Sequence, residues 1–456
     1  MTDSAGKDLT AGKPLKLILG FAVPMLLGYL FQQFYNMADA IVVGKCLGVS
    51  ALASVGSTSS INFMINGFCI GVCSGVSIPV AQRFGAGDGR GLRRFAANAA
   101  WLGLIFSVVM TVLVGVLCMD ILRWMDTPED IIQGAYDYIF IIFMGIPVTY
   151  LYNLLAGIIR SLGDSRTPVY FLLLSSVLNV ALDFYSILGL GMGVDGPALA
   201  TVFSQGVSAV LCFFYMFRRF PILRMSAEER KPDWGLMKIL CGMGVPMGLQ
   251  YSITAIGSVV LQTAVNSLGS MAVAAVSTGN KVSMFFCCPF DALGGTMATW
   301  AGQNVGAEKF DRVRQGALTA SLLGFAYSLA AFLVLLFGGK YIALLFLAPG
   351  ETEIISRVSQ FLIGNSMFYI PLTLVNVLRF AIQGMGFSGF AILAGVCEMF
   401  ARTFVGFFLV PVFGFLPACF ASPLAWICAD LFLVPAFFHC LKRLKTEAGL
   451  ENGGGE

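Results

Sequence analysis

The sequence predicts an all-α integral membrane protein with twelve transmembrane helices, arranged as two parallel repeats of six helices. Three observations support this fold class. Of the 456 residues, 57% are apolar and only 12% are charged, about half the charge of an average soluble domain. The mean hydropathy is +0.84, and long apolar stretches recur along the chain. The two halves also resemble each other in sequence. A bilayer rather than water must therefore surround most of the exterior.

Twelve apolar stretches are each long enough to cross the hydrocarbon of a membrane, which takes about 20 helical residues. They are continuous rather than alternating, so they indicate helices and not the short strands of a barrel. The predicted spans are 15–43, 50–81, 94–118, 132–159, 168–190, 195–217, 236–265, 271–302, 315–338, 354–382, 388–412 and 417–440.

The basic residues set the expected orientation, because positively charged loops stay on the cytoplasmic side of a membrane. Lys and Arg gather before the first span and after the second, fourth, sixth, eighth and twelfth spans. The opposite loops hold only Lys45, Arg123, Lys340 and Arg357. We therefore expect both termini in the cytoplasm, with terminal tails at 1–14 and 442–456.

The internal repeat divides the chain into two lobes. At an offset of 221 residues, LGVSALASVGS from Leu47 matches LGSMAVAAVST from Leu268, and QxxGA follows the second span of each half. Pro24 in the first helix similarly matches Pro246. Six helices per copy give both copies the same sense in the membrane, as in the parallel repeats of some transporters. We expect an N-terminal lobe at 15–218, a cytoplasmic linker at 219–234 and a C-terminal lobe at 235–441.

Ionisable residues inside spans are costly and therefore informative, at about 2.5 to 3.5 kcal/mol each at a helix centre. The first half holds two acids, Asp39 and Asp183, and no base to neutralise them. Polar residues that can reach the same interior are Gln32, Asn36, Asn153, Asn179 and Thr201. Carboxylate and amide oxygens without a basic partner suit a small hard cation such as Na⁺, or a proton shared between two carboxyls. The alternative is a set of satisfied polar groups that holds the bundle together.

The second half contains acids and bases together. Its spans contain three acids, Asp291, Glu398 and Asp430, and three bases, Lys281, Arg379 and Arg402. Glu398 and Arg402 are one helical turn apart. This set can neutralise itself, so ion pairs that fix helix contacts compete with a role in substrate contact or gating.

Other motifs are interpreted structurally. Pro24, Pro147, Pro246 and Pro371 lie inside spans and predict kinks, with Pro24 and Pro246 as candidate hinges. Gly67, Gly71 and Gly75 form a stripe that permits close helix packing. GMGVDG from Gly191 matches a dinucleotide motif by letter but predicts a loop, since it follows no strand.

Enzymatic and nucleic-acid functions find no support in the sequence. There is one His, no Ser/His/Asp set and no GxxxxGK[ST] motif, so we expect no ATP hydrolysis, no bound cofactor and no metal beyond Na⁺ at Asp39 and Asp183. The net charge of +3 is too small and dispersed for a nucleic-acid surface. The twelve cysteines form no CxxC pair and are interpreted as small buried hydrophobic residues.

Several stretches resemble the multidrug and toxic compound extrusion (MATE) family, and in particular its DinF-like bacterial members. They are YNMADAIVVGKCLG from Tyr35, PVAQRFGAGD from Pro79, IIRSLGDSRTP from Ile158, LNVALDFYSILGLGMGVDGPALAT from Leu178 and MATWAGQNVGA from Met297. The resemblance covers nearly the whole chain and implies a two-lobe cation/drug antiporter. It also implies a cation site at Asp39, Asn153, Asn179, Asp183 and Thr201, and a bending helix at Pro24.

The resemblance has one departure. NorM-like members carry a Glu on helix seven that helps form a cation site in the C-terminal lobe, whereas this chain has Gln250. That second site is therefore not expected here. Gln32, Asn36, Gln250, Asp291, Glu398 and Arg402 remain candidates for substrate contact or gating.

The resemblance implies a secondary transporter of a bacterial cell membrane that expels cationic or amphipathic organic compounds in exchange for H⁺ or Na⁺. We expect a monomer in the bilayer that needs no ATPase subunit. Two alternatives are a flippase for a lipid-linked precursor and a non-transporting membrane sensor. Unpaired acids disfavour the flippase, which needs a cationic cavity for a pyrophosphate, and the absence of an output domain disfavours the sensor.

Overall fold

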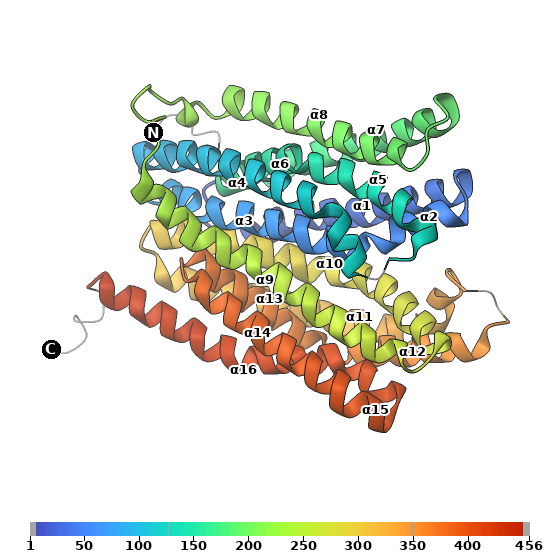
Figure 1. Cartoon of the computed structure of the whole chain (residues 1–456). Helices are drawn as coiled ribbons and strands as arrows, with labels where there is room; N and C mark the ends of the chain where they lie inside the picture. The colour runs from blue at the N-terminus through green and yellow to red at the C-terminus, as the bar shows by residue number, and fades with distance from the viewer. Residues whose placement is uncertain (1–5, 126, 348–349, 450–456) are drawn as a thin grey trace. The chain divides into compact units, whose positions relative to one another are not determined.

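The structure is a computed structural model that describes residues 6–125, 127–347 and 350–449. This described part contains sixteen α-helices, two π-helical segments and one 3-10 turn, and no β-strand (Figure 1). The elements are α1 (Pro14–Cys46), α2 (Val49–Ser57), α3 (Ser59–Gly85), α4 (Gly89–Trp124), α5 (Glu129–Met144), α6 (Ile146–Ser161), α7 (Arg166–Phe184), η1 (Tyr185–Gly189), α8 (Asp195–Arg219), η2 (Pro221–Leu223), α9 (Trp234–Asn266), α10 (Ser270–Gly306), α11 (Phe310–Ala343), α12 (Thr352–Ser366), α13 (Tyr369–Gly384), α14 (Ser388–Phe404), η3 (Val405–Leu409), α15 (Val410–Phe413) and α16 (Phe415–Glu447). The predicted all-α fold class is confirmed.

Ten helical segments of the described chain are individually long and apolar enough to span a membrane. Two further spans are bent pairs, α5 with α6 at 45° and α12 with α13 at 50°. Counting each pair once gives the twelve predicted spans. The bends lie where Pro147 and Pro371 enter the first turns of α6 and α13, positions at which a missing backbone N–H is tolerated.

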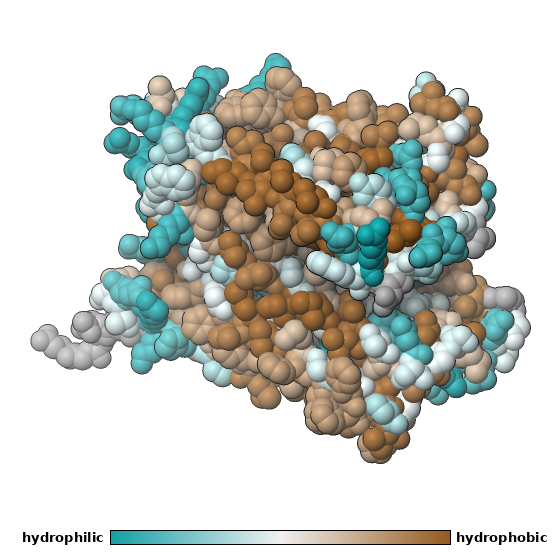
Figure 2. Space-filling view, viewed as in Figure 1, coloured by the Kyte–Doolittle hydropathy of each residue, from teal (hydrophilic) through white to brown (hydrophobic). Residues whose placement is uncertain are grey.

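Exposed apolar side chains cover much of the helix surface. On α4, the residues Leu104, Val108, Val112 and Val116 recur every four positions and are all more than half exposed. Hydrophobic residues also extend over long stretches of the face drawn in Figure 2. An apolar stripe of this size on a helix surface belongs against lipid rather than water.

Two compact units make up the chain. Within the described residues, the first contains Gly6–Asp8 and Leu27–Gly248, and the second contains Leu9–Leu26 and Leu249–Gly449. The units therefore differ from a simple cut at the predicted linker, because each takes the first half of the long helix that begins the other repeat. The exchange falls two residues after Pro24 in α1 and two residues after Pro246 in α9.

Each unit is held together by helix packing. In the first unit α3 packs against α4 and α6, and α8 packs against α6 and α7; in the second unit α10 packs against α11 and α13, and α16 against α13 and α14. The glycine stripe of α3 allows the first half of α9 to approach closely. A Cβ added to Gly71 would lie 2.5 Å from the carbonyl oxygen of Met247, and one added to Gly75 would lie 2.5 Å from that of Met243. The predicted close packing is confirmed for Gly71 and Gly75.

The predicted linker is ordered against the first unit. Glu229 receives two hydrogen bonds from the Arg93 guanidinium, at 2.9 and 2.8 Å, and a third from the backbone N–H of Ser226. These donors stabilise the ionised form and lower the pKa of Glu229 to about 2. The segment that the sequence predicts as a linker is therefore tied to α4.

Candidate functional site

Two helices of the first unit each bring an acid into its interior. α1 carries Tyr35 and Asp39 one turn apart, and α7 carries Asn179 and Asp183 with the same spacing. Asp183 is 0% exposed and Asn179 is 1% exposed. The carboxyl groups of Asp39 and Asp183 lie within hydrogen-bonding reach of each other. Two of the acids that the sequence singled out are therefore neighbours in space.

Hydroxyl and amide groups extend this pair. Asn179 donates a hydrogen bond from Nδ2 to Oγ1 of Thr201 on α8, at 3.1 Å. The same Thr201 oxygen lies 3.2 Å from the Tyr35 hydroxyl, and either group can donate. We call Tyr35, Asp39, Asn179, Asp183 and Thr201 the carboxylate cluster.

The oxygens of the carboxylate cluster lack donors. Within the described residues, Oδ1 of Asp39, Oδ1 of Asn179 and both carboxyl oxygens of Asp183 are buried without a hydrogen-bond donor. Among the described residues, the charged group that acts on Asp183 is the carboxyl of Asp39, and no base acts on it. Two carboxylates at about 4 Å repel each other by about 4 kcal/mol at an effective dielectric of 20. The arrangement can relieve that repulsion by accepting a proton or a small cation.

The end of α7 holds Asp183 in place. The helix passes directly into the π-helical segment η1, whose wider turn begins two residues after Asp183. The Ser186 hydroxyl donates to the Asp183 carbonyl at 3.1 Å. A Cβ on Gly196 at the start of α8 would lie 2.7 Å from that hydroxyl, so glycine permits the close approach. The GMGVDG motif thus connects η1 to α8, as the predicted loop requires.

Three predicted site residues share no hydrogen bond with the carboxylate cluster among the described residues. Asn153 on α6 is half-buried and donates at 2.8 Å to the Thr149 carbonyl of its own helix. Gln32 is half-buried and Asn36 is exposed, and neither shares a hydrogen bond with the two acids there. Their roles stay predictions.

Two tyrosines were missed in the sequence. The Tyr35 hydroxyl reaches Thr201, and the buried Tyr138 on α5 interacts electrostatically with Asp39 and Asp183. Tyr35 could have been found, since it precedes Asp39 by one helical turn in the YNMAD stretch. Tyr138 carries no such signal, because it lies about a hundred residues from Asp39 on another helix.

The second unit buries its polar candidates in pairs. Glu398 on α14 accepts a hydrogen bond from Arg379 on α13, and its other oxygen lies 3.5 Å from Arg402. Gln250 on α9 accepts from Gln383 on α13 at 2.6 Å. Asp291 on α10 is exposed. The ion pair expected between Glu398 and Arg402 is therefore present, with Arg379 as a second partner of Glu398.

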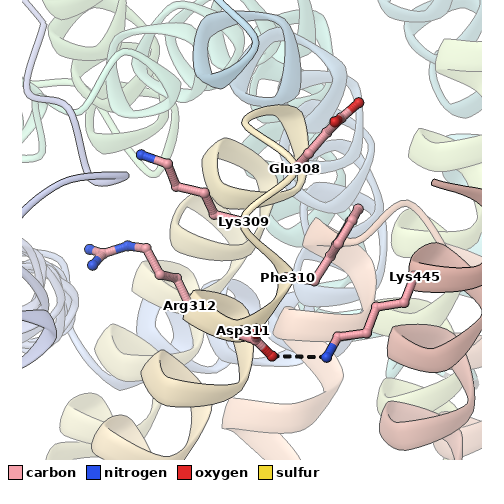
Figure 3. Close-up of a pocket in the computed structure, with 6 residues that line it drawn as sticks. All are labelled: Glu308, Lys309, Phe310, Asp311, Arg312 and Lys445. Carbon is pink, nitrogen blue, oxygen red and sulfur yellow. Dashed lines mark hydrogen bonds and ion pairs between the residues drawn. The ribbon is translucent and has the colours of Figure 1, made fainter. Parts of the chain in front are cut away.

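A surface hollow also lies in the second unit, and it contains none of the predicted site residues. It measures about 430 Å³ and is lined by Glu308, Lys309, Phe310, Asp311, Arg312 and Lys445, of which Asp311 and Lys445 are ion-paired at 2.8 Å (Figure 3). Lys309 and Arg312 donate to backbone carbonyls of residues 9–12. Two of the basic side chains that line the hollow thus bind the backbone of residues 9–12.

A metal centre of the usual kind is absent from residues 6–125, 127–347 and 350–449, where no three His, Cys, Asp or Glu side chains are placed to hold an ion. The carboxylate cluster instead combines two acids with amide and hydroxyl oxygens. This donor set fits H⁺ or a hard monovalent ion better than a transition metal.

The fold and the site define the class: a multi-pass helical membrane protein in which a buried acid lies beside a second, half-buried acid. Comparison with known proteins identifies the family. The profile of the MatE family matches residues 24–185 and 246–408, once in each half of the chain. The chain belongs to the MatE family, whose members are multidrug efflux transporters and not enzymes.

Individual relatives agree with this family. The chain is 31% identical to the probable multidrug resistance protein YoeA of Bacillus subtilis (strain 168), over 74% of each chain. It is 22% identical to the FAD transporter of Shewanella oneidensis, over 84% of this chain and 85% of that one. A solved structure, the outward-facing conformation of a multidrug resistance MATE family transporter of the MOP superfamily, superposes with a TM-score of 0.89. It is 23% identical and covers 96% of this chain and 98% of its own, which shows the shared fold.

Proposed function

We propose that this protein is a secondary active antiporter that expels cationic or amphipathic organic compounds from the cytoplasm in exchange for H⁺ or Na⁺. The observation that carries the proposal is the carboxylate cluster. Asp183 is fully buried beside Asp39, and no base of the described chain acts on it. A buried pair of this kind is costly unless it binds something positive, so we assign it to the coupling ion.

Coupling follows from differential affinity. An ion entering from outside occupies the Asp39–Asp183 pair and stabilises the state that releases the organic compound outward; loss of the ion to the cytoplasm resets the transporter. The ion drives the cycle only to the extent that it binds the two facing states with different affinity. No ATPase subunit or cofactor enters this scheme, and the protein works as a monomer in the cell membrane with both termini in the cytoplasm.

The remaining site assignments belong to the same proposal. Asn153, Asn179 and Thr201 complete the ion site around the two acids. Gln32, Asn36, Gln250, Asp291, Glu398 and Arg402 contact substrate or gate its path, and Pro24 and Pro246 act as hinges. The hinge assignment is supported by the exchange of contact units two residues after each proline. The name of the Shewanella relative illustrates that cargo differs among relatives, so the substrate class here is a proposal.

Dye efflux from proteoliposomes tests this function. The purified protein is reconstituted with ethidium as the cationic dye, and pH and Na⁺ gradients are imposed separately. We expect an inwardly directed gradient of one ion to accelerate efflux several-fold over protein-free vesicles, and the effective gradient identifies the coupling ion. Efflux that responds to neither gradient would refute the antiport mechanism.

A further inference from the structure

The second unit contains a compact set of charges that the proposed ion site does not use. Arg379 on α13 and Arg402 on α14 lie on either side of Glu398, on two helices that pack against each other. All three are more than nine-tenths buried, at 6%, 7% and 3% exposure. We call these three residues the arginine cluster.

The hydrogen-bonding capacity of the arginine cluster is not used up. Glu398 engages Arg379 with one oxygen and Arg402 with the other. Nε of Arg379 and Nη1 of Arg402 are nevertheless buried without an acceptor among the residues that the structure describes. Guanidinium N–H groups are strong charged donors, and burying them unused is unfavourable.

The contact charges also do not balance. Two guanidinium groups meet one carboxylate, so positive charge is in excess within ion-pair distance. The next acid, Asp430 on α16, is half-buried and forms no ion pair with either arginine in the described chain, although it acts on Arg379 over a longer distance. Tyr251 acts on Arg379 in the same way.

A neutral pair of glutamine side chains lies next to the cluster on α13 and α9. One turn after Arg379, Gln383 donates to Gln250 and leaves its own carbonyl oxygen without a donor. The π-helical segment η3 begins three residues after Arg402, just as η1 follows the buried acid of the first unit. Such segments frequently occur at functional sites. Both repeats thus place a π segment beside a buried charge, but the sign of that charge differs.

We propose that the arginine cluster receives an anionic group of the transported compound, with a carboxylate as the best fit. The free N–H groups of Arg379 and Arg402 would bind its oxygens, while Glu398 holds the two guanidinium groups in place. Guanidinium geometry suits planar carboxylates. This inference rests on the proposed export function and refines its substrate class from simple cations to compounds that also carry an acid.

Two dyes that differ in one group test the inference. Rhodamine 110 carries a free carboxylate, and rhodamine 123 is its methyl ester. Binding to the full-length protein in detergent is measured by fluorescence anisotropy for the wild type and for Arg402→Lys, which keeps the charge but loses the planar fork. We expect Arg402→Lys to weaken rhodamine 110 binding about tenfold and to change rhodamine 123 binding by less than about twofold. Arg219→Lys at the exposed end of α8 is the matched control and should change neither.

A second variant keeps the test decisive if Arg402→Lys does not fold. Asp430→Asn removes the nearby negative charge without touching an ion pair, so it should tighten rhodamine 110 binding about threefold or more and leave rhodamine 123 unchanged. Equal changes for both dyes, or no rhodamine 110 binding by the wild type, would overturn the inference. Ion-driven efflux is scored separately with rhodamine 123. Its absence alongside carboxylate-selective binding would refute the antiporter and leave the anion site standing.

Discussion

Neutralising Asp183 should sharply lower the affinity of the first unit for the coupling ion. Asp183 is fully buried, and the carboxyl within its reach is that of Asp39. A cation between two carboxylates is attracted by each with about 4 kcal/mol at 4 Å and an effective dielectric of 20. Asp183→Asn removes one of these attractions and keeps the shape of the side chain. At 1.4 kcal/mol per factor of ten, the ion affinity should fall by about 10²- to 10³-fold.

The assay is dye efflux from proteoliposomes across a series of imposed ion gradients, with the half-saturating ion concentration as the readout. Asp183→Asn should give background efflux at gradients that saturate the wild type, and Asp39→Asn should do the same. Asp120→Asn, an exposed acid on α4, is the matched control and should behave as wild type. If Asp183→Asn is efficiently reconstituted and half-saturates at the wild-type ion concentration, the assignment of the ion site is refuted.

Three further changes probe the site and its support. Tyr35→Phe removes a hydroxyl that contacts the threonine of α8, so the half-saturating ion concentration should rise about five- to tenfold, and an unchanged value would exclude the hydroxyl from the site. Gly71→Ala places a methyl group against a carbonyl of α9 and should lower the thermal unfolding temperature. Gly242→Ala is the control, because a Cβ there meets nothing within 4 Å, and it should leave that temperature unchanged. Equal unfolding temperatures for the two variants would contradict the close packing. Because the folded pKa of Glu229 is about 2, below its unfolded value of about 4.5, its contribution to stability is complete above that unfolded value and is lost as pH falls toward 2. Amide exchange of the linker between pH 6 and 3 should therefore lose protection in the wild type and change less in Glu229→Gln, with the exposed Glu228→Gln as control.

The sequence could predict that the acids of the carboxylate cluster lie together, because burying an unpaired charge in a membrane costs free energy. Asp39 and Asp183 stand out in spans that contain no base, and helical spacing places Asn179 one turn from Asp183. The structure brings these three side chains together with Thr201. The prolines in the spans predicted kinks as well, and the two breaks lie at Pro147 and Pro371, whereas α1 and α9 continue as helices through Pro24 and Pro246.

Other features depend on contacts between distant segments and leave little trace in the sequence. The exchange of the first halves of α1 and α9 between the two units cannot be inferred from a repeat, because the repeat boundaries follow the covalent chain. The pairing of Glu398 with Arg379 also required the structure. Glu398 and Arg402 are one turn apart on α14, but the second partner of Glu398 comes from α13.

The two units of the duplicated fold therefore differ in the sign of the buried charge beside the π-helical segment. In the first unit a π segment follows an acid that lacks a base, and in the second a π segment follows an arginine in a set where bases exceed acids at contact distance. An ion in the first unit and an anionic group in the second would bind different side chains and would not compete for them. Coupling between the two would then have to be conformational, with the ion and the compound each preferring one facing state. Variants of the arginine cluster should accordingly alter substrate selectivity without shifting the half-saturating ion concentration, whereas variants of the carboxylate cluster should do the reverse.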